Sequence, residues 1–276
     1  MGRLSHLLLS GWMILSLAGC AEALSLFPGA ISTATDPTAE ITVAAAADLQ
    51  FAFGEIAALF EEETGVRVNL VFGSTGLLTQ QIENGAPYDL IAAANIAYVE
   101  QLAAQDLVLS NSIQLYAQGR IALAVNRASG IHATMLTDLL KPEIRHIAIA
   151  NPEHAPYGVA AMQALQAAGV WEQLQPKLVY GENVRQALQY IQTGDAEAGI
   201  IALSVANAPG IVWTLIDGSL HAPLNQALAI LSRSAQPQLA AQFADFINGE
   251  RGRPIMRRYG FILPGEDPLT AEDLQP

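Results

Sequence analysis

The sequence predicts an α/β protein with two lobes, in which helices connect largely parallel strands. Three observations indicate this fold. Apolar strand-like runs alternate with stretches of helical periodicity from Ile41 onward. These units form two series of similar size, each with strand–helix–strand connections, and the expected lobes are 41–118 and 119–223. A later apolar stretch, Leu224–Leu231, is expected to return the chain, so that 224–270 completes the first lobe.

In the first lobe, each expected strand is followed by a helix. The first helix carries an apolar stripe of Leu49, Phe53, Ile56 and Phe60, and it ends at Gly65, a residue type that favours helix C-caps. Glycine also ends the second helix, at position 85. The expected strands are residues 41–46, 66–72 and 89–93, and the expected helices are residues 49–64, 75–84 and 96–104.

The second lobe repeats this alternation. Its last strand is almost wholly apolar, as expected for a strand that is covered on both faces. A final helix with Leu239, Phe243, Phe246 and Ile247 is expected to pack on the first lobe. The expected strands are residues 121–125, 147–150, 178–180 and 199–203, with helices over 156–168 and from Val184 through Ile191.

At four places an apolar strand runs directly into a short polar or small-residue cluster that begins a helix. The clusters are residues 44–48, 72–76, 151–158 and 181–184. The first N–H groups of a helix lack intrahelical partners and lie at the positive end of the helix dipole, so they bind anions readily. Because ligands of such sheets bind beyond the carboxyl ends of the strands, an anion site is predicted between the lobes.

Composition and charge narrow the class of protein. Of 276 residues, 51% are apolar and 14% are charged, which is typical of a globular chain with a substantial core. The formal net charge is −13, and no cluster of Lys and Arg is present, which argues against nucleic acid or an anionic membrane surface as a partner. Neutral dipoles can nevertheless hold an anion in an acidic protein.

The N-terminus resembles an export signal. Residues 1–20 combine a polar start containing Arg3 with the apolar stretch Leu7–Leu17, which is too short to span a bilayer. The stretch ends in a sequence like a lipobox, so Cys20 is the expected site of cleavage and lipidation; the alternative is ordinary cleavage after residues 21–23. Residues 21–40 are expected to form a tether. Cys20 is the only cysteine, which excludes an internal disulfide.

Enzymatic interpretations find little support. The sequence contains no nucleophile elbow, Walker loop or zinc-binding His-Glu-x-x-His or Cys-x-x-Cys motif. The histidines beyond the signal are widely spaced and include no i, i+4 pair. His154 lies in the third junction, and shaping the turn between Pro152 and Pro156 is favoured over a direct role in the site. The protein is therefore not expected to be an enzyme.

Several motifs together resemble the molybdate-binding proteins, the exported solute receptors of molybdate ABC importers. The resemblance covers Ile41 to about Leu263. The motifs that carry it are the alanines before Asp48-Leu49, Phe72–Gly76, Gln81–Asp89, Asn151-Pro152 through Pro156–Gly158, Gly181–Val184 and Tyr259–Phe261. The resemblance implies a type 2 periplasmic-binding-protein fold, with two α/β lobes joined by crossing strands and a tetrahedral oxyanion bound between them by neutral hydrogen bonds.

The family pattern also implies the contacts to the ion. The matching oxyanion-binding positions are Asp48, Ser74, Thr75, Tyr157 and Val184, of which Val184 offers only its backbone N–H. No cofactor is implied, and molybdenum is expected only as part of the bound oxyanion. The expected ligand is molybdate or tungstate, and the expected partner is an ABC transporter permease in the inner membrane. We expect an exported monomer in the periplasm or at the cell surface, anchored through Cys20.

Two positions depart from the family pattern. Some members have a tyrosine where this chain has Ala202, and the hydroxyl of Tyr157 could replace that contact; alternatively, Tyr157 contributes only its amide while its ring shields the site. Asp48 stands where the family usually has serine, although a carboxylate repels a dianion. The favoured interpretation is that Asp48 caps its own helix. The alternative is a protonated Asp48 that donates to the ligand.

Two other functions compete with this interpretation. A receptor for sulfate, another oxyanion or a small organic anion would share the class, but a carboxylate ligand normally calls for an arginine clamp. Arg185 is the only basic residue near a junction, and a solvent-facing position is favoured for it. A sensory domain on the same fold is disfavoured by the export signal.

Overall fold

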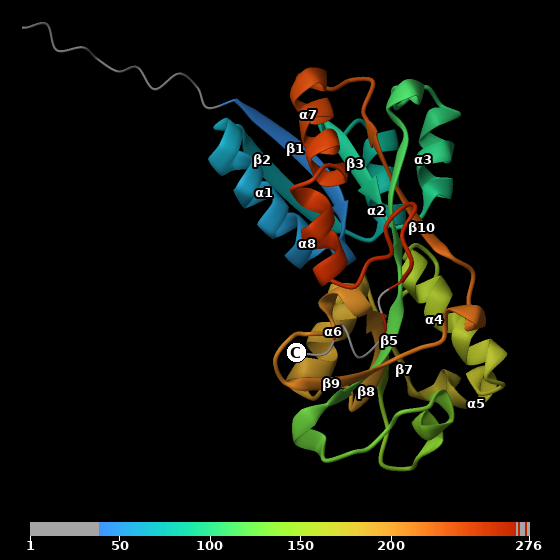
Figure 1. Cartoon of the computed structure of the whole chain (residues 1–276). Helices are drawn as coiled ribbons and strands as arrows, with labels where there is room; N and C mark the ends of the chain where they lie inside the picture. Colours follow the sequence, from blue (N-terminus) through green and yellow to red (C-terminus); the bar gives the residue numbers. More distant parts are fainter. Residues whose placement is uncertain (1–38, 269, 271–273, 275–276) are drawn as a thin grey trace, which may run out of the picture. The chain divides into compact units, whose positions relative to one another are not determined.

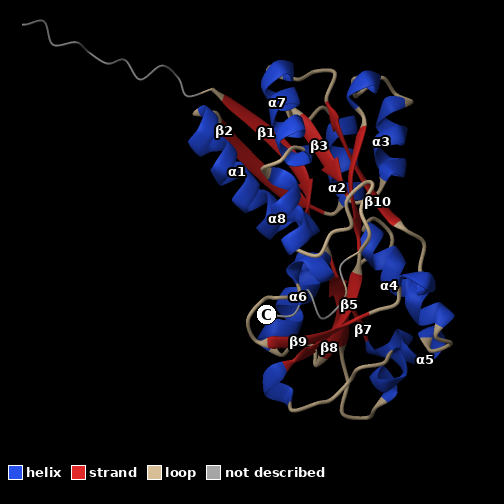
Figure 2. Cartoon of the chain, viewed as in Figure 1, coloured by secondary structure: helices blue, strands red, loops and turns tan. Residues whose placement is uncertain are grey.

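The computed structural model describes residues 39–268, 270 and 274, which belong to one compact unit. Two five-stranded mixed sheets with flanking helices make up this unit (Figures 1 and 2). The expected signal segment, Cys20 and nearly all of the expected tether lie outside the described residues.

The first sheet has the strand order β2-β1-β3-β10-β4. β1 pairs in parallel with β2 and β3, whereas β10 runs antiparallel between β3 and β4. The strands are β1 Glu40–Ala46, β2 Arg67–Gly73, β3 Leu90–Ala93, β4 Gln114–Gly119 and β10 Leu224–Ile230. The helices packed around it are α1 Gln50–Thr64, α2 Thr75–Glu83, α3 Ile96–Ala103, α7 Pro237–Asn248 and α8 Gly252–Arg258.

Alternation along the strands assigns the two faces of this sheet. Successive side chains of a strand point to opposite faces. Val43 and Ala45 belong to the apolar cluster that contains α1 and α7, whereas Ala44 between them belongs to the cluster that contains α2 and α3. The sheet is thus covered on both faces, which explains why its central strand β3 is apolar throughout.

The second sheet has the order β7-β6-β8-β5-β9. β6 is parallel to β7 and β8, and β5 is antiparallel to β8 and β9. Its strands are β5 Ile121–Asn126, β6 Ile147–Ala150, β7 Leu178–Gly181, β8 Ala198–Ala202 and β9 Ile211–Leu215, and its helices are α4 Pro156–Ala167, α5 Trp171–Leu174 and α6 Val184–Thr193. The 3-10 turns are η1 Ala47–Leu49, η2 Ser110–Ser112, η3 Arg127–Ser129, η4 Leu136–Leu140, η5 Gln175–Lys177, η6 Leu203–Val205 and η7 Gly218–Leu220.

The chain crosses between the sheets twice. Arg120 separates β4 of the first sheet from β5 of the second, and residues 216–223 lead from β9 back to β10. β10, which begins at Leu224, pairs with β3 and β4 of the first sheet, and α7 packs against β1, β10 and α1. The strands predicted from the sequence agree with the structure to within a residue or two at each end, whereas β4, β9, α5 and α8 were not predicted.

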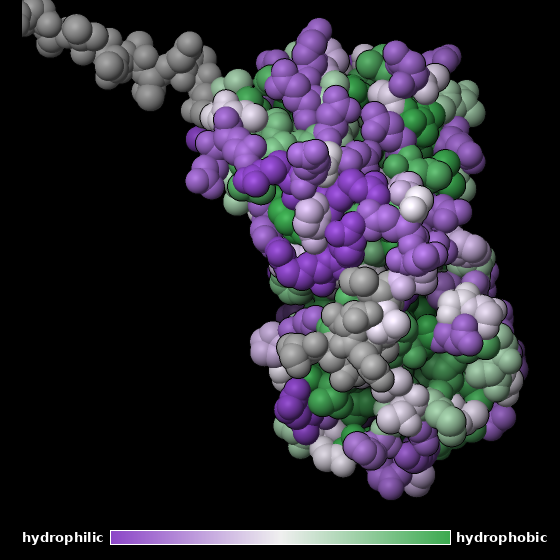
Figure 3. Space-filling model, in the orientation of Figure 1, coloured by the Kyte–Doolittle hydropathy of each residue, from purple (hydrophilic) through white to green (hydrophobic). Residues whose placement is uncertain are grey.

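Exposed apolar side chains are spread over many elements. The large ones are Phe51, Val71, Leu109, Leu115, Met135, Leu140, Tyr180 and Val212. Figure 3 shows one face, which is mostly hydrophilic over the helices of the first sheet and has more apolar area over the second. Single exposed apolar residues are ordinary on protein surfaces. Within the described part of the chain, no helix is long and apolar enough to cross a membrane.

Candidate functional site

One cavity between the two sheets brings together the five residues that the sequence singled out. Asp48, Ser74, Thr75, Tyr157 and Val184 all line it, and it encloses about 200 Å³, its open mouth included. The other lining residues are small, apolar or neutral: Ala46, Ala47, Gly73, Ala94, Ala155, Pro156 and Asn183. Asp48 is therefore the one acidic residue that lines the cavity, and no lysine or arginine lines it.

Three helices begin at residues that line this cavity. α2 begins at Thr75 directly after β2, α4 begins at Pro156 after the loop that follows β6, and α6 begins at Val184 after β7. Pro156 has no N–H, so Tyr157 supplies the first amide of α4. Each start carries the positive end of its helix dipole, and each therefore favours an anion in the cavity although no cationic side chain lines it.

At the start of α6, Asn183 caps the helix and leaves one backbone amide, that of Val184, for a ligand. The carboxamide of Asn183 accepts hydrogen bonds from the N–H groups of Arg185 and Gln186, each at 3.1 Å, and the N–H of Ala187 bonds to the Asn183 carbonyl. Within the described part of the chain, the N–H of Val184 has no hydrogen-bond partner in the cap or in the helix. Its amide can therefore bind a ligand while its buried side chain packs in the core.

At the start of α2, two hydroxyl groups are held in different ways. Thr75 is buried, and its Oγ1 accepts a hydrogen bond from the N–H of Ala94 at 3.0 Å, which leaves the hydroxyl proton for a ligand oxygen. Ser74 stands at the N-cap without making a cap bond; its Oγ lies 2.8 Å from Nδ1 of His154. When His154 carries its proton on Nδ1, the Ser74 hydroxyl is likewise available to donate to a ligand.

The loop before α4 touches the start of α2 at a second point. The N–H of Gly76 donates to the carbonyl oxygen of His154 at 2.9 Å. A Cβ at position 76 would lie 2.6 Å from that oxygen, so only glycine allows this approach. His154 thus joins the two lobes through both its side chain and its backbone. The sequence favoured a role for His154 in shaping its own turn, and these contacts with Ser74 and Gly76 were not predicted.

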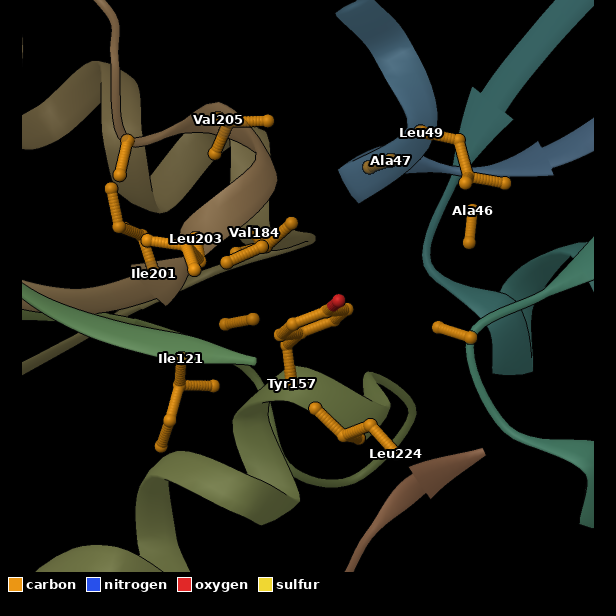
Figure 4. Packing of buried hydrophobic residues seen from close by; sticks show 14 of the residues in the cluster. Ala46, Ala47, Leu49, Ile121, Tyr157, Val184, Ile201, Leu203, Val205 and Leu224 are labelled. Atoms are coloured by element: carbon orange, nitrogen blue, oxygen red, sulfur yellow. The ribbon is translucent and has the colours of Figure 1, made fainter. Parts of the chain in front are cut away.

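A buried hydrogen-bond network spans the lobes next to the cavity. Oδ2 of Asp48 accepts from the Tyr157 hydroxyl at 2.9 Å and from Nε2 of Gln226 at 2.7 Å. Nε2 of Gln226 also lies 3.0 Å from the Tyr157 oxygen, and Oε1 of Gln226 accepts from Tyr116 at 2.8 Å. Figure 4 shows the Tyr157 hydroxyl directed toward the segment that carries Ala46 and Ala47. Asp48 Oδ1 is buried and has no hydrogen-bond partner among the described residues.

Burial controls the ionisation of this network. Desolvation raises the pKa of Asp48 to about 6, although the hydrogen bonds from Gln226 and Tyr157 act in the opposite direction. Burial and the nearby Asp48 charge also hold the pKa of Tyr157 and that of Tyr116 well above the usual value for tyrosine. Both tyrosines are therefore neutral hydrogen-bond donors at physiological pH.

The expectation that Asp48 caps its own helix is wrong. Asp48 lies inside the 3-10 turn η1, whose N-cap is Ala46, and it precedes Leu49, the N-cap of α1, so it is the N-cap residue of neither. Neither start has a side-chain cap bond. The carboxylate bonds to the opposite lobe instead, because Tyr157 reaches it from the start of α4.

Two residues of the network were missed from the sequence. Gln226 lies on the returning strand β10, where the apolar run gave no reason to single out one buried polar residue, although a glutamine in such a run is itself a signal. Tyr116 lies on β4, which was not predicted. Arg185 is exposed, as favoured from the sequence.

Other hollows carry cations that are already engaged. In the hollow near Ser129 and His132, Arg145 pairs with Glu197 at 3.2 Å and Lys141 with Asp138 at 3.0 Å. No group of three or more His, Cys, Asp and Glu among the described residues is placed to hold a metal ion. The cavity at the three helix starts is thus the anion site that the geometry favours.

Comparison with known proteins identifies the relatives of this chain. The family model of the bacterial extracellular solute-binding proteins matches residues 41–262. The molybdate-binding protein ModA of Azotobacter vinelandii is 34% identical over 82% of this chain and 90% of its own length, and ModA of Rhodobacter capsulatus is 32% identical over 90% and 97%. The solved periplasmic molybdate-binding protein of Azotobacter vinelandii superposes with a TM-score of 0.77 at 30% identity, covering 81% of this chain and 99% of that one. The predicted two-lobed α/β fold is confirmed.

The raised pKa of Asp48 predicts a pH-dependent stability. A carboxyl whose folded pKa lies above its unfolded value of about 3.9 stabilises the fold fully below that value and loses this contribution as pH rises through about 6. Asp48→Asn should therefore raise the free energy of unfolding at pH 8, by about 2–3 kcal/mol from the shift alone, and the gain should vanish near pH 4. Urea unfolding of both proteins across this range measures it.

Asp138→Asn is the control, and its expected effect on the free energy of unfolding at pH 8 has the opposite sign. Backbone N–H groups of Thr134 and Met135 hold the pKa of Asp138 at about 2, so Asp138→Asn should destabilise the protein at pH 8 and should matter less in acid. An Asp48→Asn protein that is less stable than the parent at pH 8, with unchanged cooperativity, would contradict the prediction.

Proposed function

The chain belongs to the bacterial extracellular solute-binding protein family, and from this premise we propose that it captures molybdate between its lobes and delivers it to an ABC transporter. The proposal draws on the chain-long similarity to ModA proteins and on the solved molybdate-binding protein that shares the fold. Its fold is the type 2 periplasmic-binding-protein fold, and its family consists of receptors rather than catalysts.

One observation carries the proposal: three helix starts converge on a cavity that contains no cationic side chain. Such a cavity can solvate a small dianion with neutral dipoles. A carboxylate or a phosphate ester would normally be held by arginine or lysine, and neither type lines this cavity. The geometry therefore favours a compact inorganic oxyanion.

The hydroxyl and amide groups that line the cavity determine the proposed contacts to the ion. Thr75 would donate from its hydroxyl and its amide, and Val184 and Tyr157 from their backbone N–H groups. Ser74 would donate when His154 presents Nδ1–H to it. Because the Tyr157 hydroxyl already bonds to Asp48, we propose that Tyr157 acts on the ion through its amide while its ring excludes water. Asp48 completes the set from the first junction, residues 44–48.

We propose that residues 41–118 with 224–270 form one lobe and 119–223 the other, with the two crossings acting as the hinge. Closure would bring Asp48 and Thr75 of one lobe to Tyr157 and Val184 of the other. Hydrogen bonds from His154 and Tyr157 to the opposite lobe would hold the closed form.

Selectivity would come from cavity size. Sulfate has the same charge and shape as molybdate but is smaller, so rigid amides that fit molybdate would be left partly unpaired by sulfate, at a cost in binding free energy. Tungstate differs too little in size to be excluded, and we propose that it binds as well.

The receptor would act outside the cytoplasm. We propose that the N-terminal segment exports the chain, that Cys20 anchors it, and that the closed lobes dock on a permease in the inner membrane. The scattered distribution of exposed apolar residues supports a monomer in solution.

Calorimetric titration tests the proposed ligand. We expect saturable 1:1 binding of molybdate and tungstate, with sulfate and phosphate at least about a hundredfold weaker, because a cavity mismatch leaves buried donors unpaired at roughly 1–3 kcal/mol each. Binding of sulfate in preference to molybdate would overturn the assignment.

Gly76 provides a test of closure. A Cβ at this position would meet the His154 carbonyl oxygen at 2.6 Å, so Gly76→Ala should keep the lobes apart and weaken molybdate binding by about tenfold or more, the loss of roughly one interlobe hydrogen bond. Gly54→Ala is the matched control, because its Cβ would enter open space on α1. Equal affinity of both variants would exclude closure at this contact.

Cys20 tests the anchor. In a bacterial host, the protein should incorporate a labelled fatty acid and fractionate with membranes, whereas Cys20→Ala should lose the label and appear in the soluble exported fraction. Labelling that persists in Cys20→Ala would refute anchoring at this residue.

A further inference from the structure

The two oxygens of the Asp48 carboxyl group have different surroundings. Its Oδ2 accepts hydrogen bonds from Tyr157 and Gln226, whereas its Oδ1 is buried without a partner among the described residues. Asp48 is 1% exposed and lines the cavity between the helix starts. A buried carboxylate oxygen without a donor is costly, which indicates that this oxygen acts on something beyond the residues around it.

The hydrogen bonds to Oδ2 determine where a proton would reside. Tyr157 has its hydroxyl proton directed at Oδ2, and Gln226 donates an N–H to the same atom. A proton on Oδ2 would compete with both donors, whereas a proton on Oδ1 conflicts with neither. The neutral form of Asp48 is therefore a carboxylic acid whose O–H lies on the oxygen that the network leaves open.

A dianion in the cavity makes this neutral form necessary. An ionised Asp48 would face the ion across a buried space of low polarity, where repulsion between like charges is strong. The titratable groups that interact with Asp48 are Tyr157 of α4, which bonds to it directly, and Tyr116 of β4, which bonds to Gln226; the pKa of each is raised, so both are neutral donors. Its other neighbours, Gln226 of β10 and Ser204 of η6, carry no charge.

We propose that the site binds its oxyanion together with one proton, held on Oδ1 of Asp48 and donated to an oxygen of the ion. This inference rests on the proposed function and adds the state of the ligand: an unprotonated dianion accompanied by a proton from solvent. The proton moves onto Oδ1, its O–H bonds to the anion, and no other bond is made or broken. Asp48 then contributes a donor where an ionised carboxylate would repel.

The proton makes binding depend on pH. With the lobes together, burial raises the pKa of Asp48 to about 6, and a neighbouring dianion raises it further in the complex. At a pH well below the pKa of Asp48 in the ligand-free protein, the proton is already in place and affinity is constant. Above pH 6 it must be taken up, so affinity falls as pH rises, up to about tenfold per pH unit for one linked proton.

Calorimetric titration with sodium molybdate at pH 6, 7, 8 and 9, in buffers of different ionisation enthalpy, measures both quantities. We expect the wild-type protein to take up close to one proton per ion at pH 8 and to lose about a hundredfold in affinity between pH 7 and pH 9, the limit for one linked proton.

Asp48→Asn isolates the group responsible. Its amide oxygen can keep the bonds from Tyr157 and Gln226, and its N–H can donate to the ion without any proton from solvent. We expect this variant to bind molybdate with no proton uptake and with little change in its own affinity from pH 6 to pH 9. Asp89→Asn is the matched control: Asp89 is also buried but bonds to Thr42 and Ser234 away from the cavity, so the variant should retain proton uptake.

The outcomes separate the two proposals. Molybdate binding with no proton uptake and constant affinity from pH 6 to pH 9 would overturn the proton-linked site and leave the proposed function standing. Proton uptake that persists in Asp48→Asn would assign the proton to another group and would also overturn it. Absence of molybdate binding at every pH would overturn the proposed function itself.

Discussion

The hydrogen bonds to one carboxylate oxygen hold the site together. Oδ2 of Asp48, at the end of β1, receives Tyr157 from the second sheet's side and Gln226 from the returning strand β10. Gly119, next to the first crossing between the sheets, makes this possible: a Cβ there would lie 2.1 Å from the Tyr157 hydroxyl and 2.8 Å from Nε2 of Gln226. A position without a side chain next to this crossing thus allows three polar groups from distant parts of the sequence to meet.

The same arrangement explains how a protein with a formal charge of −13 can hold an anion. Its acidic residues lie mostly on the surface, where water and salt screen them. At the cavity, the first amides of α2, α4 and α6 act at short range, and no lining side chain is cationic. Fixed amides also leave no charge behind when the ion departs, whereas a buried arginine would then lack its partner.

The fold could be predicted because each element has a local signal. Helix-ending glycines, apolar periodicity and the return at Leu224 agree with the structure, and all five candidate residues line one cavity because strand ends of a parallel sheet meet at one edge. β4 was missed because Gln114 and Gln118 interrupt its apolar pattern. The role of Asp48 was missed for a different reason: its partners lie 109 and 178 residues away, and no local pattern encodes such contacts.

Asp48 also shows how one residue couples closure to chemistry. Tyr157 follows β6 of the second sheet, so in the proposed closure its bond to Oδ2 would form only when the lobes meet, and the same approach would remove Asp48 from water. Burial favours the neutral acid, whereas parting the lobes would restore hydration and favour the carboxylate. Closure of the lobes would therefore favour proton uptake by Asp48, because the same movement removes its carboxyl group from water. A serine at this position could donate to the ion equally well in either arrangement, but its hydroxyl would not respond to pH.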